Sequence, residues 1–61
     1  MPHYTLYFFD EAQRPSGFVE FDESDDAAAI AAMGARRCGR AAELWRGDQR
    51  ILWWPPDREA H

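Results

Sequence analysis

The side chains that most often carry chemistry are scarce in this chain of 61 residues. It has one cysteine, Cys38, and two histidines, His3 and His61, which lie at opposite ends of the sequence. Zinc sites need cysteines and histidines at short, paired spacings, and a Ser-His-Asp triad needs a histidine beside its nucleophile. Neither pattern is present, so we expect no metal and no other cofactor. Cys38 lies near the end of a predicted helix, and we interpret it as a small core residue.

An acidic segment, residues 22–26, has side-chain oxygens at alternate positions, like the start of a calcium-binding EF-hand loop. That loop needs glycine at its sixth position and glutamate at its twelfth, where this chain has Ala27 and Met33. We therefore reject a calcium site. Ser24 instead predicts the N-cap of a helix, and the two aspartates after it suit the positive end of the helix dipole.

Pro2 is the remaining candidate for catalysis. Removal of Met1 would expose its secondary amine, which could act as a general base. The small tautomerases use an amino-terminal proline in this way, and the chain resembles them in that residue and in length. In that family the long helix directly follows the first strand, and here a loop and a second predicted strand intervene. A tautomerase-like enzyme therefore stays an alternative, and we expect a protein that is not an enzyme.

The composition is typical of a small globular domain with a net charge of −4: 46% hydrophobic, 15% aromatic and 30% charged residues. A domain of this size buries only about 60% of its unfolded surface, so a disulfide, a metal or a partner usually adds stability. With one cysteine and no metal pattern, we expect self-association. No apolar run approaches the roughly 20 residues that span a bilayer, and no signal peptide is recognisable, so we expect a cytoplasmic protein.

Two predicted hairpins flank one predicted helix in a single domain, residues 1–61. The strands are expected at about 3–9, 18–22, 41–46 and 50–54. Alanine is the best helix former, and an alanine-rich segment predicts the helix at about 25–38. Pro55 and Pro56 end the last strand and leave a tail, residues 55–61. The ββαββ order predicts an α+β fold, in which a four-stranded antiparallel sheet has one helix packed on one face.

The side of the helix that faces the sheet is predicted to be small. One helical stripe contains Ala27, Ile30, Ala31, Gly34 and Cys38, with Met33 beside it. Such a stripe lets the helix approach the sheet closely. This close packing would explain a glycine in a helix interior, which costs about 1 kcal/mol relative to alanine.

The second hairpin is predicted to turn at Gly47-Asp48, because glycine suits the first central position of a type II′ turn. With a two-residue turn, one face carries the pairs Leu44–Ile51 and Ala42–Trp53. The other face then carries the pairs Trp45–Arg50, Glu43–Leu52 and Ala41–Trp54.

One helix covers only one face of the sheet, so the other face should be polar, yet aromatic residues alternate onto both faces. The uncovered set that we expect is Tyr7, Phe9, Phe18, Trp45, Leu52 and Trp54. A contiguous apolar patch marks an interaction surface, and a small domain gains stability by pairing such faces in a symmetric dimer. We therefore expect a homodimer or a protein-binding module. The alternative for this face is that the tail folds back over it.

The same aromatic face could instead stack the bases of a single-stranded nucleic acid. In that case Arg46 and Arg50 would lie near the phosphates. The negative net charge disfavours this function, because nucleic-acid binding depends on neutralising phosphates. It remains a second alternative.

Two segments resemble a group of short bacterial hypothetical proteins of unknown function: residues 4–10 (YTLYFFD) and 43–47 (ELWRG). With the alanine-rich helix between them, the resemblance extends over most of the chain. It implies a stand-alone cytoplasmic domain of one α+β unit, and it brings no catalytic residues with it.

Overall fold

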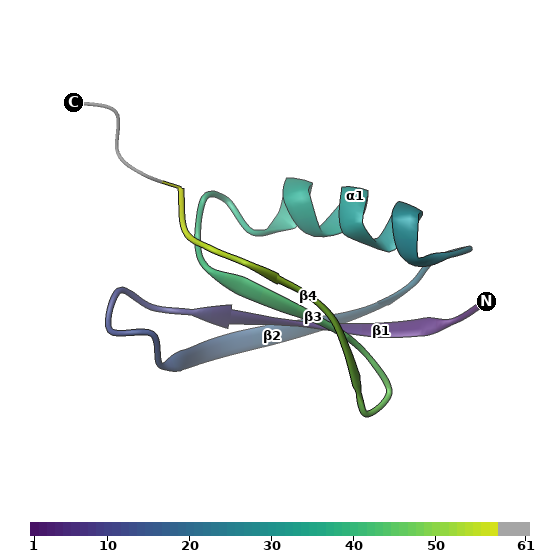
Figure 1. Cartoon of the computed structure of the whole chain (residues 1–61), viewed down its shortest axis with the longest axis horizontal. Coiled ribbons are helices and arrows are strands. Elements are labelled where there is room, and N and C mark those ends of the chain that lie inside the picture. Colours follow the sequence, from purple (N-terminus) through teal and green to yellow (C-terminus); the bar gives the residue numbers. More distant parts are fainter. Residues whose placement is uncertain (58–61) are drawn as a thin grey trace.

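The computed structural model describes residues 1–57; the rest of the predicted tail, with His61, lies outside the described residues. Five elements follow one another along the chain: β1 (His3–Phe9), β2 (Pro15–Asp22), α1 (Asp26–Arg36), β3 (Ala42–Arg46) and β4 (Gln49–Trp54). The strands form one antiparallel sheet in the order β2-β1-β3-β4, and α1 lies across one face of it (Figure 1). The predicted α+β fold with ββαββ order is confirmed.

β2 begins three residues before the predicted position, so the β1–β2 loop is shorter than expected. The carboxylate of Asp10 accepts hydrogen bonds from the backbone N–H groups of Ala12 and Arg14, both at 2.9 Å. Gln13 adopts a left-handed conformation (φ 61°). These contacts close the turn locally, so Pro15 already pairs with Phe9.

α1 is shorter than predicted at both ends. Its N-cap is Asp25, whose side chain accepts from the backbone N–H of Ala28 at 2.8 Å, so the prediction of Ser24 is wrong by one residue. Both residues are good caps, and the carboxylate of Asp25 also adds charge at the positive end of the helix. At the other end, Cys38 (φ 51°) and Gly39 (φ 77°) are left-handed and stop the helix.

The buried side of α1 is rotated from the predicted stripe. Ala29 and Met33 are fully buried, and Ile30 packs against the core. Ala27, Ala31 and Cys38 are exposed, so the prediction is wrong for these three residues. Six alanines give the helix little rotational preference beyond that of Ile30 and Met33, and the polar contacts at its two ends hold the observed orientation.

Gly34 lies where the helix meets the end of β4. A Cβ atom built on it would be 3.1 Å from Cη2 of Trp54, which is tighter than ordinary van der Waals contact. The close approach that we expected from a small helix face therefore occurs at this residue, and its partner is an indole ring.

The β3–β4 hairpin turns at the predicted place, with Gly47 at φ 62°, as the first central position of a type II′ turn requires. The pair Trp45–Arg50 also forms, and beyond it a β-bulge shifts the register by one residue. A one-residue shift moves every later side chain to the opposite face. Leu44 therefore pairs with Leu52 and Ala42 with Trp54, so the predicted pairs beyond Arg50 are wrong.

The core lies between α1 and the two central strands. Its fully buried or nearly buried hydrophobic side chains come from β1 (Tyr4, Leu6, Phe8), α1 (Ala29, Met33) and β3 (Ala42, Leu44). Leu52 and Trp54 pack against this cluster from β4. The edge strands thus complete the core, and α1 seals it from one side only.

Arg37 ties the C-terminal end of α1 to the segment after β4. Its guanidinium donates to the carbonyl oxygens of Arg40 (2.7 Å) and Pro55 (3.2 Å) and forms an ion pair with Asp57. It also lies over the ring of Trp54, 4.4 Å from the centroid. Only 4% of Arg37 is exposed. Its contacts with Pro55 and Asp57 hold residues 55–57 on the helix side of the sheet.

These contacts predict unequal effects for the two members of the ion pair. Arg37→Leu should lower the free energy of unfolding by about 2–4 kcal/mol, because it removes several charge-assisted hydrogen bonds at a buried position. Asp57→Asn should cost less than about 1 kcal/mol, because the Asp57 side chain is 66% exposed. Urea titrations followed by tryptophan fluorescence measure both values, and equal effects would contradict the assignment of Arg37 as the anchor.

Candidate functional site: the uncovered face of the sheet

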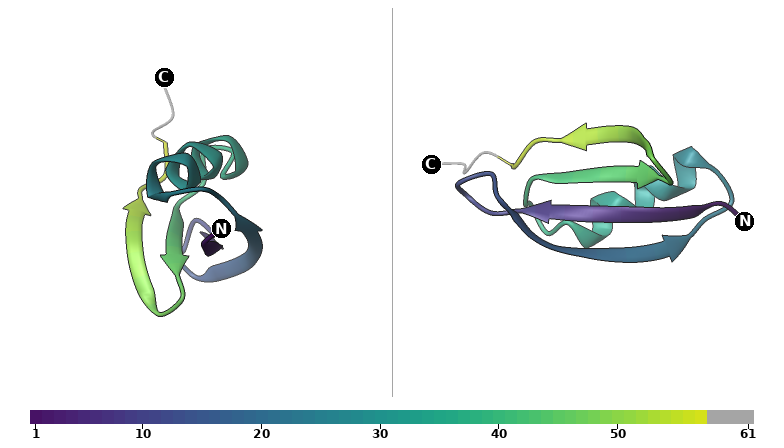
Figure 2. Two further views of the ribbon diagram at one scale, coloured as in Figure 1. Left: turned by 90° about the vertical axis from the view of Figure 1, so that its right-hand side faces the viewer. Right: turned by 90° about the horizontal axis from the view of Figure 1, so that it is seen from below.

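Five aromatic side chains lie on the face of the sheet opposite α1, which Figure 2 (right) shows with the helix behind the strands. Alternation along β1 sends Tyr7 and Phe9 to this side, since Tyr4, Leu6 and Phe8 lie under the helix. We call the following set the aromatic face: Tyr7, Phe9, Phe18, Trp45 and Trp53.

Of the six residues that we expected on the uncovered face, four lie on it: Tyr7, Phe9, Phe18 and Trp45. Leu52 and Trp54 are on the opposite side, packed against the core, and Trp53 takes their place. The bulge in β4 is the physical reason, because it reverses the faces of the residues after Ile51, whereas Ile51 itself packs against the core as predicted. No residue type in β4 signals this bulge, since the strand contains neither glycine nor proline.

The rings of the aromatic face contact one another across the strands. Tyr7 lies 5.9 Å from Phe18 and 6.5 Å from Trp45, measured between ring centroids, and the contact with Trp45 is edge-to-face. Phe9 makes a similar edge contact with Trp53 at 5.6 Å. Such pairs contribute about 0.5–1.5 kcal/mol each beyond area burial, so the rings stabilise one another's positions on the sheet.

Much of this aromatic surface is open to solvent. Phe18 is 58% exposed, Tyr7 37% and Trp53 36%. Isolated exposed hydrophobic residues are normal in soluble proteins, but a contiguous group on one face indicates a binding surface.

A carboxylate lies within the aromatic face. Glu43 of β3 pairs with Tyr7 on one side and with Trp53 on the other. Its side chain, 19% exposed, accepts a hydrogen bond from Nε1 of Trp45 and another from Nη1 of Arg50, both at 3.1 Å. Sequence reasoning missed this residue as a member of the site. The signal was its position two residues before Trp45 on the strand, together with the predicted pairing of Trp45 with Arg50.

His3 forms a polar border at the end of the face where β1 begins. Its Nε2 lies 2.7 Å from Oε1 of Glu20, and its Nδ1 lies 2.8 Å from Oδ1 of Asp22. Both ring nitrogens can donate only in the imidazolium form. The hydrogen bonds to Glu20 and then Asp22 accordingly raise the pKa of His3 above its usual 6.5.

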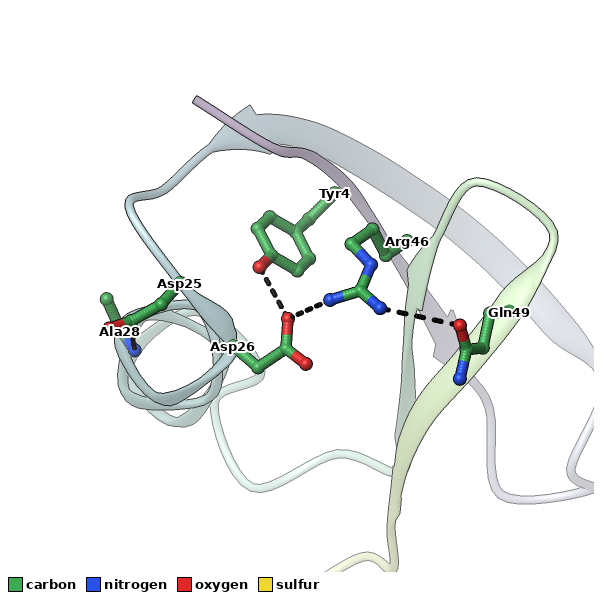
Figure 3. A network of polar contacts seen from close by, with 6 residues as sticks. All are labelled: Tyr4, Asp25, Asp26, Ala28, Arg46 and Gln49. Carbon is green, nitrogen blue, oxygen red and sulfur yellow. Dashed lines mark hydrogen bonds and ion pairs between the residues drawn. The ribbon is translucent and has the colours of Figure 1, made fainter.

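A second group of polar side chains lies at the N-terminal end of α1 (Figure 3). The hydroxyl of Tyr4 and Nη1 of Arg46 both donate to Oδ1 of Asp26, at 2.6 and 2.7 Å. The Tyr4 hydrogen bond and the Arg46 charge lower the pKa of Asp26, and the same hydrogen bond raises the pKa of Tyr4. This network fastens the first turn of α1 to β1 and to the second hairpin.

Pro2 lines a shallow hollow of about 500 Å³ beside this network. The Tyr4 hydroxyl and the Arg46 guanidinium, which also line it, already bind Asp26. The backbone carbonyl of Pro2 accepts from the N–H of Glu23 at 3.2 Å. The hollow is therefore built from side chains that stabilise the fold.

Cys38 lies at the opposite end of the helix and borders a hollow of about 770 Å³ with Asp10, Arg40 and Pro56. It is exposed, so the interpretation of Cys38 as a core residue is wrong. Its left-handed conformation turns it away from the helix face that packs on the sheet.

Residues 1–57 contain no group of three or more histidine, cysteine, aspartate or glutamate side chains placed to hold a metal ion. Within the same range, no helix has the length and apolarity needed to cross a membrane. Comparisons of the chain with protein-family models, curated proteins and solved structures found no match.

The geometry at His3 predicts a measurable titration. The pKa of His3 should lie above 6.5 in the folded protein and return towards that value in Glu20→Gln, because the first of its two acceptors loses its charge. Since the folded pKa exceeds the unfolded one, the contribution to stability is complete below pH 6.5 and disappears as the pH rises through the folded pKa. Imidazole proton shifts in NMR, assigned with His3→Gln, provide the measurement. An unchanged pKa in Glu20→Gln would contradict the contact.

Proposed function

We propose that the protein is a non-enzymatic binding module, and that its aromatic face docks on the same face of a second copy of the chain. The observation that supports this most is the exposure of Phe18, Tyr7 and Trp53 together on one sheet face, which α1 leaves uncovered (Figure 2). Two sheets pack face to face at about 10 Å with interdigitating side chains, as in a β-sandwich. A second copy would supply the layer that the first lacks.

The size of the face suits a dimer of modest affinity. Four strands at about 4.8 Å spacing and about 3.3 Å per residue give a face of roughly 20 × 20 Å. Two such faces would bury on the order of 1,000 Å², at the lower end of specific interfaces. We therefore expect association that depends visibly on protein concentration.

The ends of the described chain leave this face free for a partner. Residues 55–57 follow β4 towards the helix side, where the N–H of Asp57 donates to the carbonyl of Gly39 at 3.0 Å and Arg37 binds both Pro55 and Asp57. The described part of the tail therefore gives no support to the alternative in which the tail covers the aromatic face. Cys38, an exposed free thiol, suits a reducing compartment, and we propose the cytoplasm.

The two alternatives receive less support from the geometry. On the uncovered face, Glu43, Glu20 and Asp22 lie among or beside the aromatic rings and would repel phosphates. Around Pro2, the hydroxyl and guanidinium that line the same hollow both bind Asp26, so the contacts that the structure records for them fasten the helix to the sheet.

The dimer predicts a clear effect of one charge on the aromatic face. Phe18→Glu should weaken association by at least tenfold, because a carboxylate would be buried without a partner. Its fold should be unchanged, since Phe18 is 58% exposed. The matched control is Ala31→Glu, which adds the same charge on the exposed side of α1. Sedimentation equilibrium over a hundredfold range of concentration measures the dissociation constants.

Salt distinguishes the proposal from nucleic-acid binding. Sodium sulfate should maintain or tighten an apolar dimer, whereas it would release a bound oligonucleotide. A wild-type protein that is monomeric over the whole concentration range would refute the dimer, and salt-sensitive binding of oligothymidylate would then favour the alternative.

A further inference from the structure

Building on the dimer proposed above, we infer that Glu43 and Arg50 select the second copy and set its register on the aromatic face. In this arrangement Arg50 of each copy donates to Glu43 of the other, so the interface contains two reciprocal ion pairs. Three features of the structure lead to this inference.

The first feature is the position of Glu43. It lies between Tyr7 and Trp53 in the strand pairing, and only 19% of its side chain reaches solvent. A partner that covers the aromatic rings also covers this carboxylate. A fully desolvated carboxylate is costly unless charged donors surround it, so a partner that brings a second cation beside Arg50 is favoured over one that brings none.

The second feature is spare hydrogen-bonding capacity on both groups. Each oxygen of Glu43 accepts one hydrogen bond, from Trp45 and from Arg50, and a carboxylate oxygen has room for a second. Arg50 has five N–H donors, of which the structure records one in use, and its side chain is 55% exposed. Arg50 can therefore keep its own Glu43 and reach a second carboxylate across the interface.

The third feature is that a negative and a positive side chain, Glu43 and Arg50, lie side by side on the aromatic face. In a two-fold interface, residue i of one copy contacts residue j of the other and the reverse. A neighbouring acid and base therefore become complementary to their own rotated image. An unrelated partner would need the same mixed pattern among apolar groups, and this requirement gives the second copy its specificity.

Charge reversal in separate chains tests the inference. Glu43→Arg alone and Arg50→Glu alone should each self-associate at least tenfold more weakly than the wild type, because each homodimer opposes like charges. An equimolar mixture should recover dimers, since both pairs across the interface are then restored. Within each single variant, the side chains at positions 43 and 50 carry the same charge, so pairing within one chain cannot explain the recovery. Native mass spectrometry separates the heterodimer from the homodimers by mass, and recovery would show that the pairing is between chains.

The outcomes separate this inference from the proposed function. If the wild type dimerises and Phe18→Glu does not, but the mixture forms no excess of heterodimer, the ion-pair inference is wrong and the dimer stands. If the wild type is monomeric, both the proposed dimer and the ion-pair inference are wrong. Circular dichroism checks that each single variant folds. Should either be unfolded, Glu43→Gln mixed with Arg50→Gln provides the same test, because only the heterodimer keeps one pair between chains and should again be preferred.

Discussion

A single helix can cover only one face of a four-stranded sheet, and the remaining features of this protein depend on that constraint. β1 has large apolar side chains in both directions, with Tyr4, Leu6 and Phe8 under α1 and Tyr7 and Phe9 on the uncovered side. Residues 1–57 contain no second element that covers this face. A second face of this composition would add little to the stability of an isolated monomer, because water still reaches much of it. Its apolar area contributes when another molecule excludes that water.

Polar contacts at both ends of α1 fix how the helix lies on the sheet. Asp26 binds Tyr4 and Arg46 at its first turn, and Arg37 binds the segment after β4 at its last. Between them, Ala29 and Met33 provide the fully buried contacts, and Gly34 lets the ring of Trp54 approach. A helix rich in alanine has a weak rotational preference of its own, so Asp26 and Arg37 help to fix which side is buried. The bulge in β4 is part of the same arrangement, because it brings Trp54 beneath Gly34 and Arg37.

The order of elements could be predicted because it depends on local chemistry. The face on which some side chains lie could not, because it depends on long-range packing. The alanine run, the Gly47 turn and the prolines after Trp54 act within a few residues, so the elements and the α+β fold follow from sequence. The faces of β1 and β2 also follow, because Tyr7, Phe9 and Phe18 alternate regularly with core residues. The faces of Leu52, Trp53 and Trp54 do not. Three large apolar residues in a row fit either register, and the bulge that decides between them is stabilised by contacts with a helix distant in sequence.

Glu43 was the part of the surface hardest to recognise from the sequence, because its contacts also depend on long-range packing. A glutamate in a strand is usually solvated, and its neighbours Leu44 and Trp45 indicate only a half-buried strand. Its position becomes distinctive only in the folded sheet, where Trp53 lies opposite it and Trp45 and Arg50 each donate a hydrogen bond to its carboxylate at 3.1 Å. An apolar face alone would accept many partners and many registers. A carboxylate embedded in that face would penalise any partner that cannot neutralise it, so in the dimer that we propose Glu43 would both weaken non-specific association and define the specific interface.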